Sequence, residues 1–223
     1  MTSPLQGIAA IGFDLDNTLY ARDAAMKAWL TRLFPEGGAL LREALETDNS
    51  GFVPRHEFYA WLAERVDWAK DWRDVEARYQ REALTLIAED LAIQSAVESL
   101  AARYPVAVLT NGGGFQRRKL ECLRLSACFA PERVIVTGEI GHDKPDARAF
   151  ARLAGVFSVA PEQILFVGDN PVNDIEGAAA VGMRTCWVRL SAHHECSVPA
   201  DLVVRSVAEL PALLNRGLGG YPG

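Results

Sequence analysis

The chain has 223 residues, 49% of them hydrophobic and 23% charged, and a formal net charge of -6 at pH 7. This composition predicts a globular protein with a sizeable core, and the acidic balance argues against a nucleic-acid-binding surface. The densest basic run, Arg117-Arg118-Lys119, is expected to be a solvated helix face. With no basic amino-terminal region, no apolar stretch of about 20 residues and four cysteines without a paired pattern, the sequence predicts a cytoplasmic protein without a membrane span.

The first predicted element is a buried strand over residues 8–13, an apolar run that ends at Asp14. Residues 21–92 then show helical periodicity and no strand pattern. Helices are expected over residues 25–34, 58–66 and 75–91, with breaks at residues 37–38 and 49–54. The sequence therefore predicts a helical cap over residues 21–92, inserted into a core formed by residues 1–20 and 93–223.

Strand and helix patterns alternate after the predicted cap. The expected strands are residues 106–109, 134–137, 164–167, 185–188 and 202–204. The expected helices are residues 95–103, 115–125, 147–154 and 174–181. Such alternation predicts an α/β fold, a Rossmann-like doubly wound parallel sheet with helices on both faces. Ligands of such sheets bind at the carboxyl ends of the strands, so the cap would lie over that edge as a lid.

Two carboxylates follow the first strand, Asp14 and Asp16. Neighbouring carboxylates repel, so one can stay ionised and attack while the other carries a proton. A pair of acids in a surface turn is the simpler alternative. The next core strand ends in Thr110-Asn111-Gly112, where a hydroxyl and amides could bind phosphate oxygens, although the same residues also suit an ordinary turn.

Lys144 precedes a predicted helix and offers a cation for a phosphate monoester, or is a surface lysine beside a helix start. Asp169 follows the strand over residues 164–167, and Asp174 lies five residues later. Carboxylates at this position suit a hard cation such as Mg2+, and Asp174 could equally be a helix N-cap.

In this order and spacing, Asp14-Leu15-Asp16-Asn17-Thr18, Thr110-Asn111, Lys144-Pro145 and the segment from Gly168 to Asp174 resemble the motifs of the haloacid dehalogenase-like superfamily, in its magnesium-dependent phosphatase branch. The resemblance implies that Asp14 is the nucleophile and Asp16 the general acid/base. It implies that Thr110 holds the transferring phosphoryl group, with Asn111 and Gly112 as neighbouring donors, and that Lys144 supplies positive charge.

The resemblance also implies a Mg2+ site. Its ligands would be the carboxylates of Asp14 and Asp169 and the backbone carbonyl of Asp16, with Asp174 in support.

The function implied is a phosphatase acting on a small phosphorylated metabolite through an aspartyl-phosphate. Haloacid dehalogenases lack the acid that is Asp16 here, whereas a phosphomutase of the same superfamily and a non-enzymatic phosphometabolite-binding protein stay as alternatives. The sequence leaves open whether the protein is a monomer or a homodimer. Candidates for cap residues that face the substrate are Arg22, Lys27, Trp29, Arg55, His56 and Trp61.

Overall fold

The computed structural model describes residues 5–190 and 196–218. Its chain divides into two compact units. One unit comprises Met1–Tyr20 and Glu89–Gly223 and contains the sheet; the other, Ala21–Ala88, is helical. We call them the sheet unit and the helical unit.

The sheet unit is built on six parallel strands in the order β3-β2-β1-β4-β5-β6. The strands are β1 (Ala10–Phe13), β2 (Val106–Thr110), β3 (Val134–Val136), β4 (Ile164–Gly168), β5 (Arg184–Val188) and β6 (Leu202–Val204). Every residue of β1, β2 and β4 is buried, as expected for apolar strands covered on both faces. The predicted Rossmann-like parallel sheet is confirmed.

The strand register aligns the carboxyl ends of the three central strands. Phe13 pairs with Val108 of β2 and with Val167 of β4. Because parallel strands run in the same direction, the residues that follow β1, β2 and β4 reach the same edge of the sheet. This is the edge at which open parallel sheets bind ligands.

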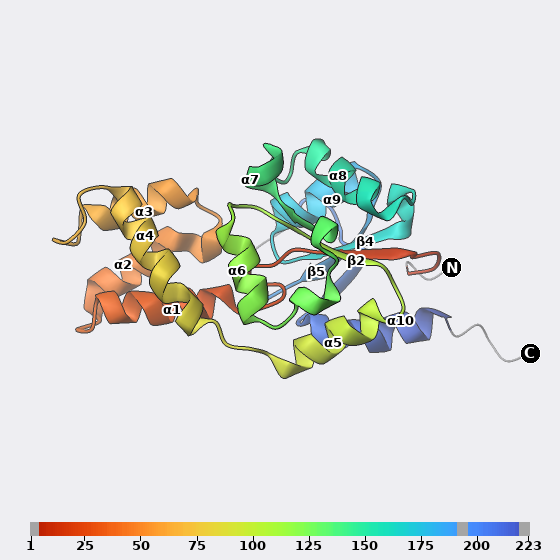
Figure 1. The fold of residues 1–223 in the computed structure, drawn as a ribbon, viewed down its shortest axis with the longest axis horizontal. Helices are drawn as coiled ribbons and strands as arrows, with labels where there is room; N and C mark the ends of the chain where they lie inside the picture. The colour runs from red at the N-terminus through yellow and green to blue at the C-terminus, as the bar shows by residue number, and fades with distance from the viewer. Residues whose placement is uncertain (1–4, 191–195, 219–223) are drawn as a thin grey trace, which may run out of the picture. The chain divides into compact units, whose positions relative to one another are not determined.

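Helices cover both faces of the sheet, with α8 and α9 on one side and α5 and α10 on the other (Figure 1). The helices of this unit are α5 (Leu91–Ala101), α6 (Phe115–Cys122), α7 (Thr137–Ile140), α8 (Ala147–Phe157), α9 (Gly177–Ala180) and α10 (Leu210–Leu218). Phe150 and Leu153 of α8 pack into a core cluster with Phe166 of β4, and the rings of Phe150 and Phe166 meet edge to face at 5.2 Å. This packing fixes the helix that follows Lys144 against the sheet.

The sheet unit differs from the sequence prediction in several places: helix α10 was not predicted, and the helix predicted over residues 115–125 ends at Cys122. Two further differences follow β3 and β4. The strand predicted to reach Thr137 ends at Val136, because Thr137 begins the short helix α7. The helix predicted over residues 174–181 starts earlier, as a π-helical turn over Pro171–Glu176 that continues into α9. Both differences lie at strand ends, where backbone groups leave the sheet ladder.

The helical unit contains α1 (Arg22–Leu33), α2 (Gly38–Asp48), α3 (Arg55–Ala63) and α4 (Trp72–Glu82). Helix α2 was not predicted, and the helix predicted over residues 75–91 is wrong beyond Glu82, where a 3-10 turn over Ala83–Leu86 follows. Two of the candidate specificity residues, Arg22 and Trp29, are buried in this unit. Arg22 pairs with Asp48, and Trp29 packs edge to face on Tyr79, so both have structural roles within the unit.

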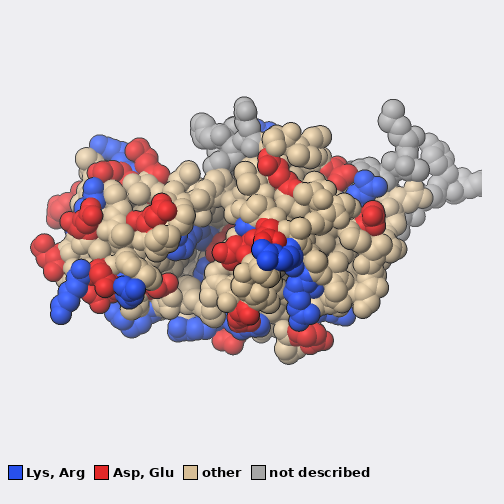
Figure 2. Space-filling model, turned by 90° about the horizontal axis from the view of Figure 1, so that it is seen from above, with Lys and Arg blue, Asp and Glu red and all other residues tan. Residues whose placement is uncertain are grey.

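Charged side chains of both signs are interspersed on the face shown in Figure 2, in line with the small net charge. Of the helices formed by residues 5–190 and 196–218, none has the length and apolar character that crossing a membrane requires.

Candidate active site

Asp14 sits directly after β1, and its backbone N–H donates to the carbonyl of Val167 at 2.8 Å, which extends the ladder between β1 and β4. Its side chain is buried. Leu15, fully buried, separates it from Asp16 and anchors this stretch in the core. The polypeptide therefore presents two carboxylates from a rigid strand end.

Lys144 contacts two of the predicted acids at once. Its Nζ donates to Asp14 Oδ1 and to Asp174 Oδ1, each at 2.6 Å, and all three side chains are buried. The main chain at Lys144 is held by Asn111, whose side-chain amide donates to the Lys144 carbonyl at 3.0 Å and accepts its N–H at 2.8 Å. The end of β2 thus positions the lysine that lies beside the carboxylate following β1.

The third and fourth acids come from the segment after β4. Asp174 accepts the N–H of Asn170 at 2.9 Å, which turns its carboxylate back toward the strand end. Gly168 makes room for that carboxylate, because a Cβ there would lie 2.5 Å from the Cβ of Asp174. One carboxylate oxygen each of Asp14, Asp169 and Asp174 lie within 4.8 Å of one another, a grouping that could hold a metal ion.

The group formed by Asp14, Asp169 and Asp174 carries more negative than positive charge, because a single ammonium, that of Lys144, pairs with Asp14 and Asp174. Burial raises the pKa of Asp14 to about 7; Lys144 opposes this rise, and the negative charges of Asp174 and Asp16 add to it. Burial and the charges of Asp14 and Asp174 also raise the pKa of Asp169 well above its ordinary value. Three carboxylates, those of Asp14 and Asp174 buried and that of Asp169 half-buried, face one ammonium and form an oxygen donor set that suits a divalent cation such as Mg2+.

Asp16 has different surroundings. Asn17, with a φ of 60°, turns the chain so that the Tyr20 hydroxyl donates to Asp16 Oδ1 at 2.5 Å. Lys119 Nζ donates to Oδ1 and Oδ2 at 2.7 and 2.9 Å, and Gln116 Nε2 donates to Oδ2 at 3.1 Å. Burial opposes ionisation, but the charge of Lys119 and these hydrogen bonds outweigh it and hold the pKa of Asp16 well below its usual range.

The three predicted residues after β2 have partners within the protein. The Thr110 hydroxyl accepts from Gln116 Nε2 at 2.7 Å and retains its own hydrogen for a ligand. The side chain of Asn111 is paired with the main chain of Lys144, and the N–H of Gly112 donates to Thr137 Oγ1 at 3.2 Å. Asn111 and Gly112 thus have structural partners here, and their contact with substrate stays a prediction.

Sequence reasoning missed Tyr20, Gln116 and Lys119, and the expected solvated face at Lys119 is wrong. Lys119 and Gln116 are each only 4% exposed. They share the inward face of α6 at a spacing of three residues, whereas Arg118 is exposed. The spacing of Gln116, Lys119 and the apolar Leu120 was the available signal, since the run of three basic residues spans both faces of one helix.

Comparison with known proteins identifies the family of this chain. Residues 8–182 match the model of the family described as haloacid dehalogenase-like hydrolase. A glyceraldehyde 3-phosphate phosphatase from Pyrococcus furiosus is 27% identical over 96% of this chain and 96% of its own. A phosphoserine phosphatase from Thermus thermophilus is 44% identical over 84 residues, 37% of this chain and a third of that enzyme (33%).

A solved structure shares the fold. The HAD-hydrolase YfnB from Bacillus subtilis, described as bound to magnesium, has a TM-score of 0.77 and 20% identity over 93% of this chain and 99% of that one. Since the family model spans most of the sequence and phosphatases are among its relatives, the protein belongs to the haloacid dehalogenase-like hydrolases and is a phosphoric monoester hydrolase.

Proposed function

We propose that the protein hydrolyses a small phosphorylated metabolite through an aspartyl-phosphate intermediate, with Mg2+ as its cofactor. The observation that carries this proposal is the pairing of Asp14, at the end of β1, with the buried Lys144 and two further acids. A carboxylate on a rigid strand end, beside a fixed cation, is positioned for nucleophilic attack.

In the first half-reaction, a carboxylate oxygen of Asp14 attacks phosphorus and the bond from phosphorus to the ester oxygen breaks. The leaving oxygen takes a proton from the carboxyl group of Asp16 and departs as an alcohol. Asp16 must enter this step protonated, against the low pKa that Lys119 and its hydrogen bonds give it in the free protein. The Thr110 hydroxyl and the Lys144 ammonium stabilise the charge on the phosphoryl oxygens.

In the second half-reaction, a water molecule gives a proton to Asp16 and attacks the phosphorus of the aspartyl-phosphate. The bond from phosphorus to the Asp14 oxygen breaks, which releases phosphate and restores both carboxyl groups to their starting states.

Asp14, Asp169 and Asp174 would hold the metal, together with the backbone carbonyl of Asp16 that the family resemblance adds. When bound, Mg2+ neutralises charge on the phosphate and on the carboxylates. Its binding would also offset the burial and the repulsion between acids that together raise the pKa values of Asp14 and Asp169.

Support for a small substrate comes from the relatives. The phosphatase from Pyrococcus furiosus, which aligns over nearly the whole chain, is named for a three-carbon sugar phosphate, and the one from Thermus thermophilus for a phosphorylated amino acid. Both are phosphomonoesters of small metabolites, and we infer the same substrate class here.

The test is hydrolysis of p-nitrophenyl phosphate with Mg2+, with EDTA, and by Asp14→Asn and Asp169→Asn variants. We expect activity that EDTA and Asp14→Asn each abolish, and an Asp169→Asn variant that needs far more Mg2+. Glu132→Gln, which removes an exposed carboxylate of the sheet unit, is the matched control and should leave turnover unchanged. Turnover by Asp14→Asn at the wild-type rate would refute the nucleophile, and activity that persists in EDTA would refute the metal requirement.

A further inference from the structure

We propose that Tyr20, Gln116 and Lys119 are positioning residues, which together hold the Asp16 carboxylate in the orientation that proton transfer to the leaving group requires. We call these three residues the Asp16 clamp. The inference rests on the proposed function, because it assigns a purpose to residues around the general acid/base of that reaction.

The clamp contacts both oxygens of Asp16. Oδ1 accepts from the Tyr20 hydroxyl at 2.5 Å and from Lys119 Nζ at 2.7 Å. Oδ2 accepts from Lys119 Nζ at 2.9 Å and from Gln116 Nε2 at 3.1 Å. Rotating the carboxylate would break at least two of these four hydrogen bonds, so one orientation is favoured.

Burial separates the clamp from the face of Asp16 that is left open. Lys119 and Gln116 are each 4% exposed, whereas the side chain of Asp16 is 26% exposed. The carboxylate is thus held from the protein side while part of it stays accessible. Burying an ammonium to make such a pair carries a desolvation penalty that largely cancels its contribution to stability, which favours a functional purpose for the pair.

Gln116 extends the clamp to a second catalytic group. Its Nε2 also contacts Thr110 Oγ1 at 2.7 Å and the carbonyl of Asn111 at 3.1 Å. The proton donor after β1 and the hydroxyl at the end of β2 are therefore fixed relative to each other through one amide. Such a link keeps a fixed distance between Asp16, which would protonate the leaving group, and Thr110, which would bind the phosphoryl group.

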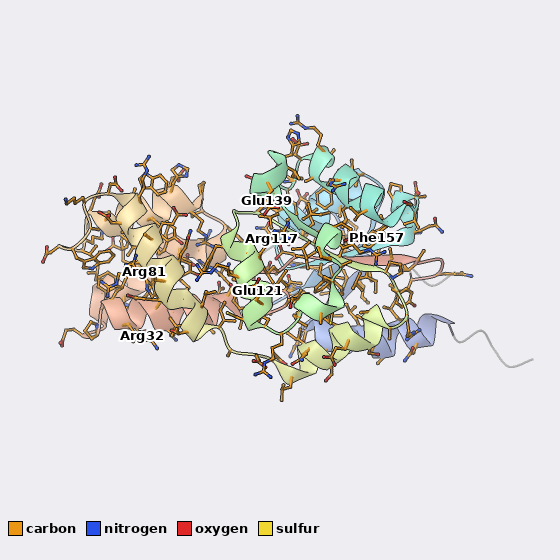
Figure 3. The ribbon with its side chains drawn as sticks, in the orientation of Figure 1. Arg32, Arg81, Arg117, Glu121, Glu139 and Phe157 are labelled. Carbon is orange, nitrogen blue, oxygen red and sulfur yellow. The ribbon has the colours of Figure 1, made fainter. Side chains whose placement is uncertain are left out.

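The helix that carries Gln116 and Lys119 is itself anchored. Arg117 pairs with Glu139 of α7 at 2.7 Å and donates to the Val134 carbonyl of β3 at 2.9 Å. Figure 3 shows Arg117 and Glu139 side by side, where α6 meets α7. The clamp is thus built on elements tied to the edge of the sheet rather than on a free helix.

Losing the clamp should impair protonation of the leaving group more than attack by Asp14. Esters with a basic alkoxide leaving group depend on that proton, whereas p-nitrophenolate leaves with little need of it. Misplacing a catalytic group by about 1 Å can lower a rate by a factor of about 100. We therefore expect kcat/KM for an alkyl phosphate to fall about 10- to 100-fold, and that for p-nitrophenyl phosphate to fall much less.

The experiment compares Lys119→Met, Gln116→Met and Tyr20→Phe with the wild type, using glycerol phosphate and p-nitrophenyl phosphate as the two substrates. The constant kcat/KM is the readout because it reports the steps up to and including the first phosphoryl transfer. Arg118→Met, which changes an exposed basic residue of the same helix, is the control. Tyr20→Phe and Gln116→Met leave the charge of Lys119 in place, so they test orientation apart from the rise in the Asp16 pKa that Lys119→Met would bring. They also keep the test valid if Lys119→Met does not fold.

Selective loss on glycerol phosphate in the clamp variants, with Arg118→Met unchanged, supports the inference. An equal loss on both substrates, or no loss, overturns it, because a merely structural role would not distinguish leaving groups. If the wild type hydrolyses neither substrate, the proposed phosphatase function is wrong. That result differs from failure of the clamp alone, in which the wild type is active and the variants lose activity equally on both substrates or not at all.

Discussion

Replacing Asp14 by asparagine should make the metal-free protein more stable while it abolishes turnover. The pKa of this buried carboxyl is raised from 3.8 to about 7, mainly by burial and despite the attraction of Lys144. Above pH 7, folding therefore places a charged group where the neutral form is preferred. Asparagine is close in shape to the neutral carboxyl group and carries no charge, so the penalty disappears.

The size of the effect follows from the pKa values. A rise from 3.8 to about 7 corresponds to about 4 kcal/mol at pH 8 and to about 2 kcal/mol at pH 5. These are upper limits, because the NH2 group of asparagine replaces an oxygen that can accept from Lys144. We expect Asp14→Asn to raise the free energy of unfolding by about 2–4 kcal/mol at pH 8.

The raised pKa of Asp14 also determines how the free energy of unfolding changes with pH. Since the folded pKa lies above the unfolded one, the native state binds more protons between the two values, and wild-type stability falls as pH rises from about 4 to about 7. The variant lacks this group, so the two proteins should converge below about pH 4 and differ fully above about pH 7.

Asp16→Asn is the matched control, with the opposite expected sign. The pKa of Asp16 is held low because Lys119 outweighs the effect of burial, so the ionised form contributes stability above its ordinary pKa. Removing that charge also leaves Lys119 buried beside a neutral amide, and we expect a loss of about 1–3 kcal/mol.

The measurement is urea unfolding of the three proteins in EDTA at pH 5 and pH 8, followed by circular dichroism. A metal-free Asp14→Asn variant that is less stable than the wild type at pH 8 would refute the account of the acid group. So would a stability difference of the same size at both pH values.

Two further predictions concern packing and the helical unit. Gly168→Ala should lower the free energy of unfolding, measured in urea, by about 1–3 kcal/mol, because the added Cβ would overlap Asp174. The control Gly155→Ala, where a Cβ has open space on α8, should raise it by about 0.5–1 kcal/mol. Equal effects of the two substitutions would contradict the close approach of Gly168 to Asp174. Arg22→Met should lower the free energy of unfolding by about 2–4 kcal/mol at pH 7, because it removes the buried one of the two arginines that pair with Asp48 and leaves only the more exposed Arg55. Although burial opposes it, Arg22 lowers the pKa of Asp48, so this difference should shrink as pH falls below 3.8, and a constant difference across that range would contradict the pairing.

The sheet and its motifs could be predicted because each depends on local sequence. The apolar runs of β1, β2 and β4 are buried on both faces, so they read as strands without knowledge of their neighbours, and the polar residues after them mark the strand ends. Parallel pairing then brings Asp14, Thr110 and Asp169 to one edge of the sheet.

The remaining errors have tertiary or local causes. Lys119 looks like its exposed neighbour Arg118 in sequence, and only the packing of α6 turns one of them toward Asp16. Helix α2 was missed because Gly37 and Gly38 indicate a break; both have positive φ, and the helix starts at Gly38 itself. The end of α4 was misplaced because the apolar residues of the following 3-10 turn continue the helical pattern.

The structure gives two carboxylates, only two residues apart, opposite electrostatic surroundings. Asp14 shares its cation, Lys144, with another acid and has a raised pKa, whereas Asp16 has Lys119 and two neutral donors and a lowered one. Two acids that both paired with one lysine would have similar surroundings, whereas Asp14 pairs with Lys144 and Asp16 with Lys119. The two lysines come from different crossover connections of the parallel sheet, one beyond β2 and one beyond β3, so the topology itself supplies separate cations at adjacent positions. A nucleophile and a proton carrier need unequal surroundings, since two equivalent carboxylates would compete for the same proton. In the metal-free protein the proton favours Asp14, so a cation held by Asp14, Asp169 and Asp174 would have to reverse that order for Asp14 to attack.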